Sequence, residues 1–247
     1  MSVELENGHR VTAAVQHVDL DDAWRVHKTV FGKSWHGTTV GNEQKRSLDQ
    51  ERTLSYLQYR AGGLFSSDAD MILSLSFHEQ EESRERIRSD GRKDVQGTDV
   101  GTLGLWGQLS VPSKAGVWTL GAEVYEDDVD SFRTDYNADG TIRAIRIHGP
   151  AADNATYRTS SVFVQDQFSF GDRTELTGGL RYTRSEADAK KVQDPVTGNR
   201  IAVRDTWTDL TGSLRLIRQL DDAGNVRLYA GLSQGFRAPN LSDLTRF

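Results

Sequence analysis

The stretch Val226-Arg-Leu-Tyr-Ala-Gly-Leu-Ser-Gln-Gly-Phe-Arg-Ala-Pro-Asn-Leu-Ser-Asp-Leu244 lies near the C-terminus and is the first guide to the fold. In its first half, apolar side chains such as Leu228 and Leu232 alternate with small or polar ones, which is typical of a strand with one apolar face. In its second half, Pro239 cannot donate to a hydrogen-bond ladder and Asn240 favours a turn. The stretch predicts a strand that ends in a loop, and such a strand needs neighbours in a sheet.

The same alternation recurs along the chain and predicts nine strands. The clearest covers residues 174–183, where Leu176 and Leu180 lie on one face and Glu175 and Arg181 on the other. We place the nine strands at residues 9–18, 52–64, 70–78, 98–110, 116–125, 157–169, 174–183, 205–218 and from 226 onward. A run of strands without helical patterns between them indicates an all-β fold with antiparallel pairing.

The connections between the predicted strands alternate between long loops and tight turns. The long loops are residues 19–51, 79–97, 126–156 and 184–204, and they span 19 to 33 residues. A transmembrane β-barrel has this asymmetry, because its turns on one side of the membrane are short and its outer loops are long. A soluble sandwich has no reason to place every long loop at one end, so the pattern favours an antiparallel transmembrane β-barrel.

Composition removes several classes of protein. The chain has 247 residues, no cysteine, and a net charge of −6 without a basic stripe, so we expect no disulfide, no thiolate metal site and no nucleic-acid partner. The first residues lack the regions of a signal peptide, and no run of about 18 apolar residues exists to form a membrane helix. The mean hydropathy of −0.59 still allows a barrel, because only one face of a barrel strand is apolar.

Two stretches resemble motifs of the TonB-dependent outer-membrane receptors. Ser161-Val-Phe-Val-Gln-Asp-Gln-Phe168, followed by Asp172-Arg-Thr-Glu-Leu-Thr-Gly-Gly-Leu-Arg-Tyr182, is similar to a hairpin of this family. Residues 233–244 are similar to its strand-to-loop motif, whose central positions are Phe236, Arg237, Ala238, Pro239, Asn240 and Leu241. Segments 17–22, 29–32 and 36–39 resemble an outer loop of the family more weakly. The resemblance covers essentially the whole chain.

The resemblance implies a fold larger than this chain. Receptors of the family close about 22 strands around an N-terminal plug. The sequence predicts nine strands of such a barrel, with no plug domain and no signal peptide. We therefore expect residues 1–247 to be a partial TonB-dependent receptor β-barrel domain, because an open sheet leaves two bare edges that lipid does not tolerate.

The resemblance also implies a function, which is the binding and import of a scarce nutrient across the outer membrane of a Gram-negative bacterium. The implied ligand is a ferric siderophore (an iron-siderophore complex) or another metal chelate, with haem and cobalamin-type compounds as further classes. The implied partners are the TonB energising complex, acting through the missing plug, and outer-membrane lipid. No cofactor is implied. Two alternatives stay open, a soluble β-sandwich that binds a ligand and a porin-like barrel.

Candidate ligand-binding residues lie in the predicted outer loops. His27, Trp35 and His36 belong to the first long loop, where a histidine either ligates haem iron or is simply solvated. The charged segment 79–94 is expected to be a solvated loop at the mouth of the receptor.

No catalytic or metal site is predicted. Residues 135–140 match the first positions of a calcium loop, but Arg146 occupies the twelfth position, where a bidentate glutamate is needed. The sequence shows no paired carboxylates, no nucleophile elbow and no metal-ligand spacing. The chain is therefore not expected to be an enzyme.

Overall fold

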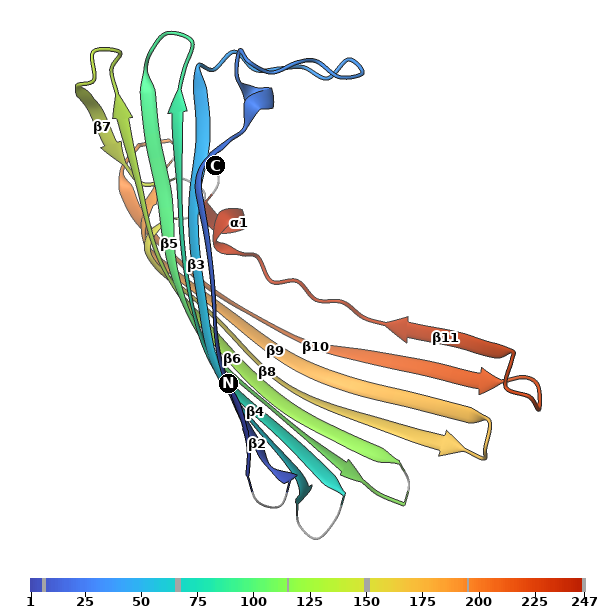
Figure 1. Ribbon diagram of the computed structural model, residues 1–247. Helices are drawn as coiled ribbons and strands as arrows, with labels where there is room; N and C mark the ends of the chain where they lie inside the picture. Colours follow the sequence, from blue (N-terminus) through green and yellow to red (C-terminus); the bar gives the residue numbers. More distant parts are fainter. Residues whose placement is uncertain (6–7, 65–67, 115, 149–151, 195, 246–247) are drawn as a thin grey trace.

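A computed structural model describes residues 1–5, 8–64, 68–114, 116–148, 152–194 and 196–245. These residues form one curved antiparallel sheet in the order β1-β2-β3-β4-β5-β6-β8-β9-β10-β11, with β7 paired to β6 (Figure 1). The strands are β1 Ser2–Glu4, β2 Arg10–Trp24, β3 Lys45–Leu64, β4 Ala69–Ile87, β5 Lys93–Pro112, β6 Val117–Tyr136, β7 Ile142–Arg146, β8 Asp153–Phe170, β9 Thr174–Gln193, β10 Arg200–Gln219 and β11 Arg227–Ser233. The sheet is open, with a convex and a concave face (Figure 1).

Two short helical elements lie at the end of the sheet opposite the short turns. They are the 3₁₀ helix η2, Val26–Lys28, and the α-helix α1, Leu241–Thr245. Across the described ranges, no helix has the length and apolar character needed to cross a membrane.

The predicted all-β, antiparallel architecture with short turns at one end is confirmed. All nine predicted strands are present, and the short strands β1 and β7 are additional to them. Most strands are also longer than predicted, with 20 residues in β3 and 19 in β4. The added lengths arise where polar sequence forms strand.

Strand β4 shows why the sequence pattern ends too early. Its apolar alternation stops at Phe77, yet the strand continues to Ile87 with charged side chains on both faces. Hydrophobicity cannot alternate where both faces are polar, although the backbone ladder continues. Segments 79–97 and 184–204, predicted as long loops, are therefore mostly strand. At this end the connection of residues 25–44 remains a long loop.

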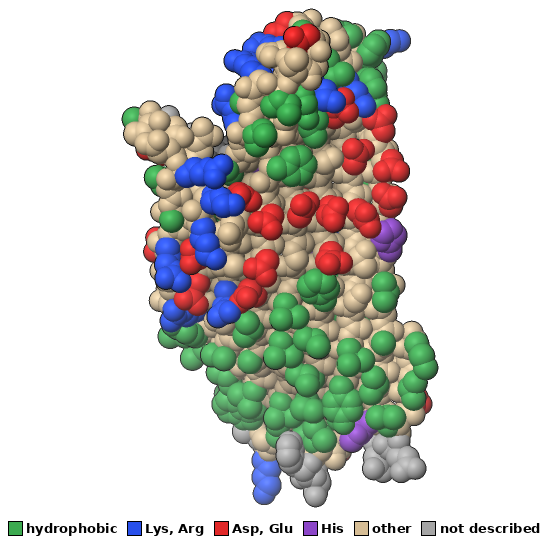
Figure 2. Space-filling model, turned by 90° about the vertical axis from the view of Figure 1, so that its left-hand side faces the viewer, with side chains coloured by type: hydrophobic (Ala, Val, Ile, Leu, Met, Phe, Trp, Pro, Cys, Tyr) green, Lys and Arg blue, Asp and Glu red, His purple; other side chains and the backbone are tan. Residues whose placement is uncertain are grey.

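The convex face carries a belt of apolar side chains next to the short turns (Figure 2). Cross-strand register makes direct neighbours of Leu57, Leu75, Leu105 and Val124, each between 41% and 49% exposed. An apolar surface that no other described part of the chain covers marks a site of contact with another protein or with a membrane. Lipid-facing side chains of barrel strands form such a belt.

A row of carboxylates marks the far limit of the apolar belt (Figure 2). Direct cross-strand neighbours over five strands are Asp19, Glu51, Glu81, Asp99 and Asp130. A barrel strand needs only about 9–11 residues to span a membrane, and β3 to β6 continue past the row. The distal parts of these strands therefore project beyond the apolar belt.

The concave face is polar, and the glycine at position 121 leaves room there for a neighbouring aromatic ring. Arg181 pairs with Glu123 and donates to Ser161 Oγ at 2.8 Å, which links three adjacent strands across this face. The ring of Phe163 occupies the space where a side chain at Gly121 would lie. Such a face suits the wet or plugged interior of a large barrel.

The same substitution should destabilise the protein on the convex face and have little effect on the concave face. In the full-length protein, Leu57→Arg should lower the free energy of unfolding from lipid vesicles by about 2–4 kcal/mol, because a barrel would place this charge among side chains that face lipid. Gln58→Arg, one residue away on the concave face, should change the free energy of unfolding little. Equal losses for the two variants would show that the convex belt does not face lipid.

Candidate functional site

Residues 25–44, which contain the predicted ligand-binding side chains, connect β2 with β3 at the end opposite the short turns. The base of this loop is held by backbone contacts. The Gly41 N–H donates to the His27 carbonyl at 2.8 Å, and Thr29 forms a parallel bridge with Glu43. Thr29 is fully buried there. The loop therefore leaves the sheet from a fixed base and reaches out on the concave side (Figure 1).

The structure brings two of the three predicted ligand residues together. The rings of Trp35 and His36 meet edge to face, with 4.6 Å between centroids, and Trp35 is 74% exposed. The Trp35 N–H donates to Thr38 Oγ1 at 3.0 Å and closes the turn that presents the pair. His27 lies at the base of the loop instead. Within the described ranges, no three metal-ligating side chains gather into a metal site.

The strand-to-loop motif leaves the sheet and caps α1. Asn240 and Asp243 form a reciprocal cap, in which the Asp243 N–H donates to Asn240 Oδ1 at 2.9 Å and the Asn240 N–H donates to Asp243 Oδ2 at 3.1 Å. Arg237 also donates to Asp243 Oδ2, at 3.0 Å. The charged and polar members of the motif thus fix its own conformation. Phe236 and Ala238 lie in the extended segment between β11 and the cap.

The motif is docked on the concave wall of the sheet (Figure 1). The Tyr157 hydroxyl on β8 donates to the Pro239 carbonyl at 3.0 Å. Leu241 packs against a small apolar cluster on the wall, formed by Val129, Ala152, Ala155, Ala189 and Val192. The motif therefore lies inside the curve of the sheet.

Six arginines that the sequence did not identify as ligand-binding candidates lie at the same end of the sheet. The arginine cluster consists of Arg46, Arg84, Arg86, Arg88, Arg133 and Arg146. Register places Arg133 on the same face as Val129, a member of the apolar cluster against which Leu241 of α1 packs. Directly paired residues link Arg46, Arg84, Arg86 and Arg146 to the position of Arg133, so these arginines share its face. The cluster therefore occupies the concave face.

Two carboxylates organise the arginine cluster. Asp94, whose side chain is 2% exposed, accepts from Arg86 at 2.7 Å and from Arg84 at 3.1 Å. Asp135 pairs with Arg133 at 2.9 Å and with Arg146 at 3.2 Å. Asp94 thereby links β4 with β5, and Asp135 links β6 with β7.

Electrostatics within the cluster fix two protonation states. Burial opposes the charge of Asp94, but the hydrogen bond from Arg86 and the positive charges of Arg84 and Arg133 outweigh it and keep the carboxyl pKa below its ordinary value. Burial, with Arg84 and Arg133 nearby, also lowers the pKa of His148. The His148 imidazole is therefore neutral at neutral pH, and its Nε2 contacts the Gln96 amide.

The sequence contained a signal for this cluster. Arg84, Arg86 and Arg88 recur at every second position, which places them on one face of a strand. With residues 79–94 predicted as a solvated loop, this alternation carried no information, because alternate positions share a face only in a strand.

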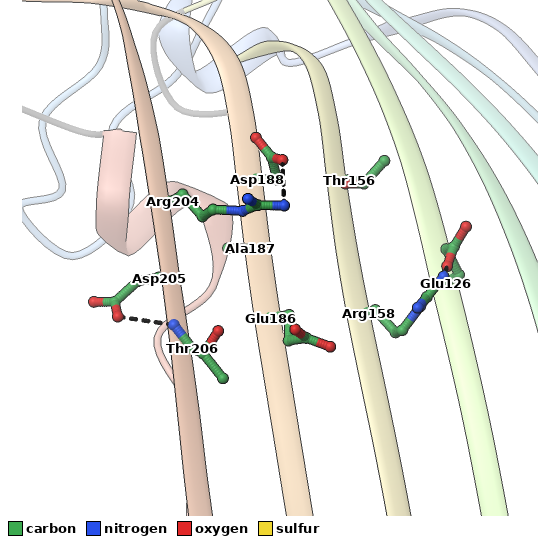
Figure 3. A pocket seen from close by; sticks show the side chains of 9 residues that line it. All are labelled: Glu126, Thr156, Arg158, Glu186, Ala187, Asp188, Arg204, Asp205 and Thr206. Carbon is green, nitrogen blue, oxygen red and sulfur yellow. Dashed lines mark hydrogen bonds and ion pairs between the residues drawn. The ribbon is translucent and has the colours of Figure 1, made fainter.

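A hollow on the convex face has a different character (Figure 3). It is lined by Glu126, Thr156, Arg158, Glu186, Ala187, Asp188, Arg204, Asp205 and Thr206. Arg158 pairs with Glu126, and Arg204 pairs with Asp188 at 3.2 Å. Glu126 shares the face of Val124 in the apolar belt. The hollow therefore lies on the outside of the curve and is not part of the concave site.

The docking of the motif predicts a local effect of one hydroxyl. In the full-length protein, Tyr157→Phe should speed hydrogen exchange of the amides of residues 241–244, because it removes a hydrogen bond worth about 1 kcal/mol. Tyr182→Phe, on the convex face, should leave this exchange unchanged. Identical protection in both variants would mean that the Tyr157 hydroxyl does not hold the motif.

Comparison with known proteins places this geometry in a family. The sequence profile described as "TonB dependent receptor-like, beta-barrel" matches residues 5–247. No curated protein matches the sequence at a significant level.

Solved structures share the fold at low sequence identity. The "Copper transporter OprC" has a TM-score of 0.64 at 14% identity, with 94% of this chain and 43% of that chain covered. The unliganded "ferric citrate transporter FecA" gives 0.59 at 13% identity, covering 90% and 33%. BauA, "the Ferric preacinetobactin receptor from Acinetobacter baumannii", gives 0.57 at 14% identity, covering 93% and 38%.

The chain spans less than half the length of these structural relatives. Members of the matched family are outer-membrane β-barrels of Gram-negative bacteria, and they act as transporters, not as enzymes. With the family profile matched over nearly all residues and an antiparallel sheet of the expected kind, the chain belongs to the TonB-dependent receptor family.

Proposed function

We propose that this chain is part of the barrel of an outer-membrane receptor that binds and imports a scarce nutrient, a ferric siderophore or another metal chelate. The observation that carries the proposal is one sheet of this family with an apolar convex belt and a polar concave wall. The similar structures are named for copper, ferric citrate and ferric preacinetobactin, which supports a metal-containing cargo for this receptor.

In the proposed mechanism, the ligand is first captured at the end of the sheet opposite the short turns. The exposed pair Trp35 and His36 on the projecting loop contacts the ligand, and His27 lines the base of the same loop. The ligand then passes along the concave wall, where Glu123 and Arg181 are paired. A plug outside these residues, driven by the TonB energising complex, opens the path, while the convex belt contacts outer-membrane lipid.

The observed sheet argues against the two alternative functions. A β-sandwich covers the apolar face of one sheet with a second sheet, whereas the described residues form a single sheet whose apolar side chains stay exposed. A porin-like barrel would have no need of a plug, and the matched family is that of the plugged, TonB-dependent receptors.

The complete gene that encodes this chain should support uptake that depends on TonB. A Gram-negative strain lacking the gene, supplied with ferric chelates as its sole iron, should lose growth and uptake of radiolabelled iron for at least one chelate. The intact gene should restore both in a strain with TonB and neither in a strain without it. A large excess of inorganic iron, which bypasses high-affinity receptors, serves as the growth control. Unchanged uptake of every metal and metal chelate on removal of the gene would contradict the proposed function.

A further inference from the structure

The arginine cluster contains like charges placed directly opposite each other. Arg46 faces Arg86 across β3 and β4, and Arg133 faces Arg146 across β6 and β7. Directly opposed like charges destabilise a sheet. Polar side chains without charge would satisfy this wet face equally well, so the arrangement is not required by the fold.

The carboxylates within the cluster do not balance its charge. Six guanidinium groups meet three carboxylates, those of Glu43, Asp94 and Asp135. The nearby Glu82, hydrogen-bonded to Gln50, still leaves an excess of positive groups. Neutral His148 adds no charge of either sign. The concave face therefore carries a local positive potential at this end of the sheet.

The hydrogen-bonding capacity of the cluster is not fully used. Arg84 Nε and His148 Nδ1 are buried and have no hydrogen-bond partner in the described part of the chain. Buried polar atoms without partners are uncommon in folded proteins. The side chains of Arg88 and Arg146 are 38% and 46% exposed, so their guanidinium groups can bind a further anion while keeping their present partners.

We propose that the arginine cluster is an anion-binding site that selects polyanionic chelates, whose carboxylate or phenolate oxygens contact Arg88, Arg133 and Arg146. The site rests on the proposed function, since it assigns the ligand class of the same receptor. Arginine forks bind such oxygens through two parallel hydrogen bonds, which a neutral chelate cannot match in strength. Asp94 acts as the fixed counter-ion that holds Arg84 and Arg86 in place.

The acidic row on the convex face sharpens this selectivity. Asp99 and Asp130 lie on the outer surface of the same strands that carry Asp94 and Arg133 on the inner one. An approaching polyanion is therefore repelled by the outside of these strands and attracted to their inside.

The test uses the complete receptor, purified in detergent, with three probes: ferric citrate, an anionic ferric catecholate and a neutral ferric trihydroxamate. The double variant Arg133→Gln/Arg146→Gln should weaken binding of at least one anionic probe about 10- to 100-fold, the loss expected for one or two charged hydrogen bonds. The salt dependence of that binding should become shallower. The control Arg184→Gln/Arg204→Gln, on the convex face, should bind as the unchanged receptor does.

A second variant separates ligand binding from folding. Arg88→Gln, the substitution of an exposed side chain 3.5 Å from Asp94, should also weaken anionic probes without altering the unfolding temperature. Anionic binding that both cluster variants leave unchanged, or no binding of either anionic probe to the unchanged receptor, would overturn the inference. If TonB-dependent uptake of a neutral chelate persists in that case, the proposed function stands while the anionic ligand class fails.

Discussion

The structure depends on the register of one continuous antiparallel sheet. Directly opposed residues share a face, so apolar positions such as Leu75 and Leu105 add up to a belt only when every strand keeps its alignment. A slip of one residue would turn the belt toward the concave side and place Glu123 and Arg181 on the convex side. Register is therefore the constraint that creates an outside and an inside from a single sheet.

Sequence patterns predicted this architecture where the two faces differ in polarity and missed it where they do not. Strand β9 was recognisable because leucines alternate with charged side chains, and the Gly-Asp pair near Gly171 signals a turn. The distal half of β4 was not recognisable, because a ladder between two polar faces leaves no mark in hydrophobicity. The arginine cluster was not predicted for the same reason. The two-residue spacing of Arg84, Arg86 and Arg88 indicates a shared face only if this segment is strand. The pairing of Trp35 with His36, in contrast, required only their adjacency and a turn.

Charge, like hydrophobicity, differs between the two faces. The convex face beyond the belt carries carboxylates in one row, and the concave face of the same strands carries the arginine cluster. Alternation explains how both occur in one sequence, because Glu79 and Glu81 fall on one parity of β4 and Arg84 and Arg86 on the other. The nearly neutral balance of the segment therefore hides two surfaces of opposite sign, separated by the thickness of one strand.

The strand-to-loop motif ends the pairing of β11 with β10 and redirects the chain. The last ladder bond runs from the Gln234 N–H to the Gly212 carbonyl at 2.9 Å, after which the chain leaves β10. Pro239 has no N–H to resume the ladder, and the Asn240 cap begins α1 instead. Tyr157 then fixes the departing chain to the concave wall. The proline and the cap therefore do more than stop a strand, because they redirect the chain from the wall of the sheet to the space that the wall surrounds.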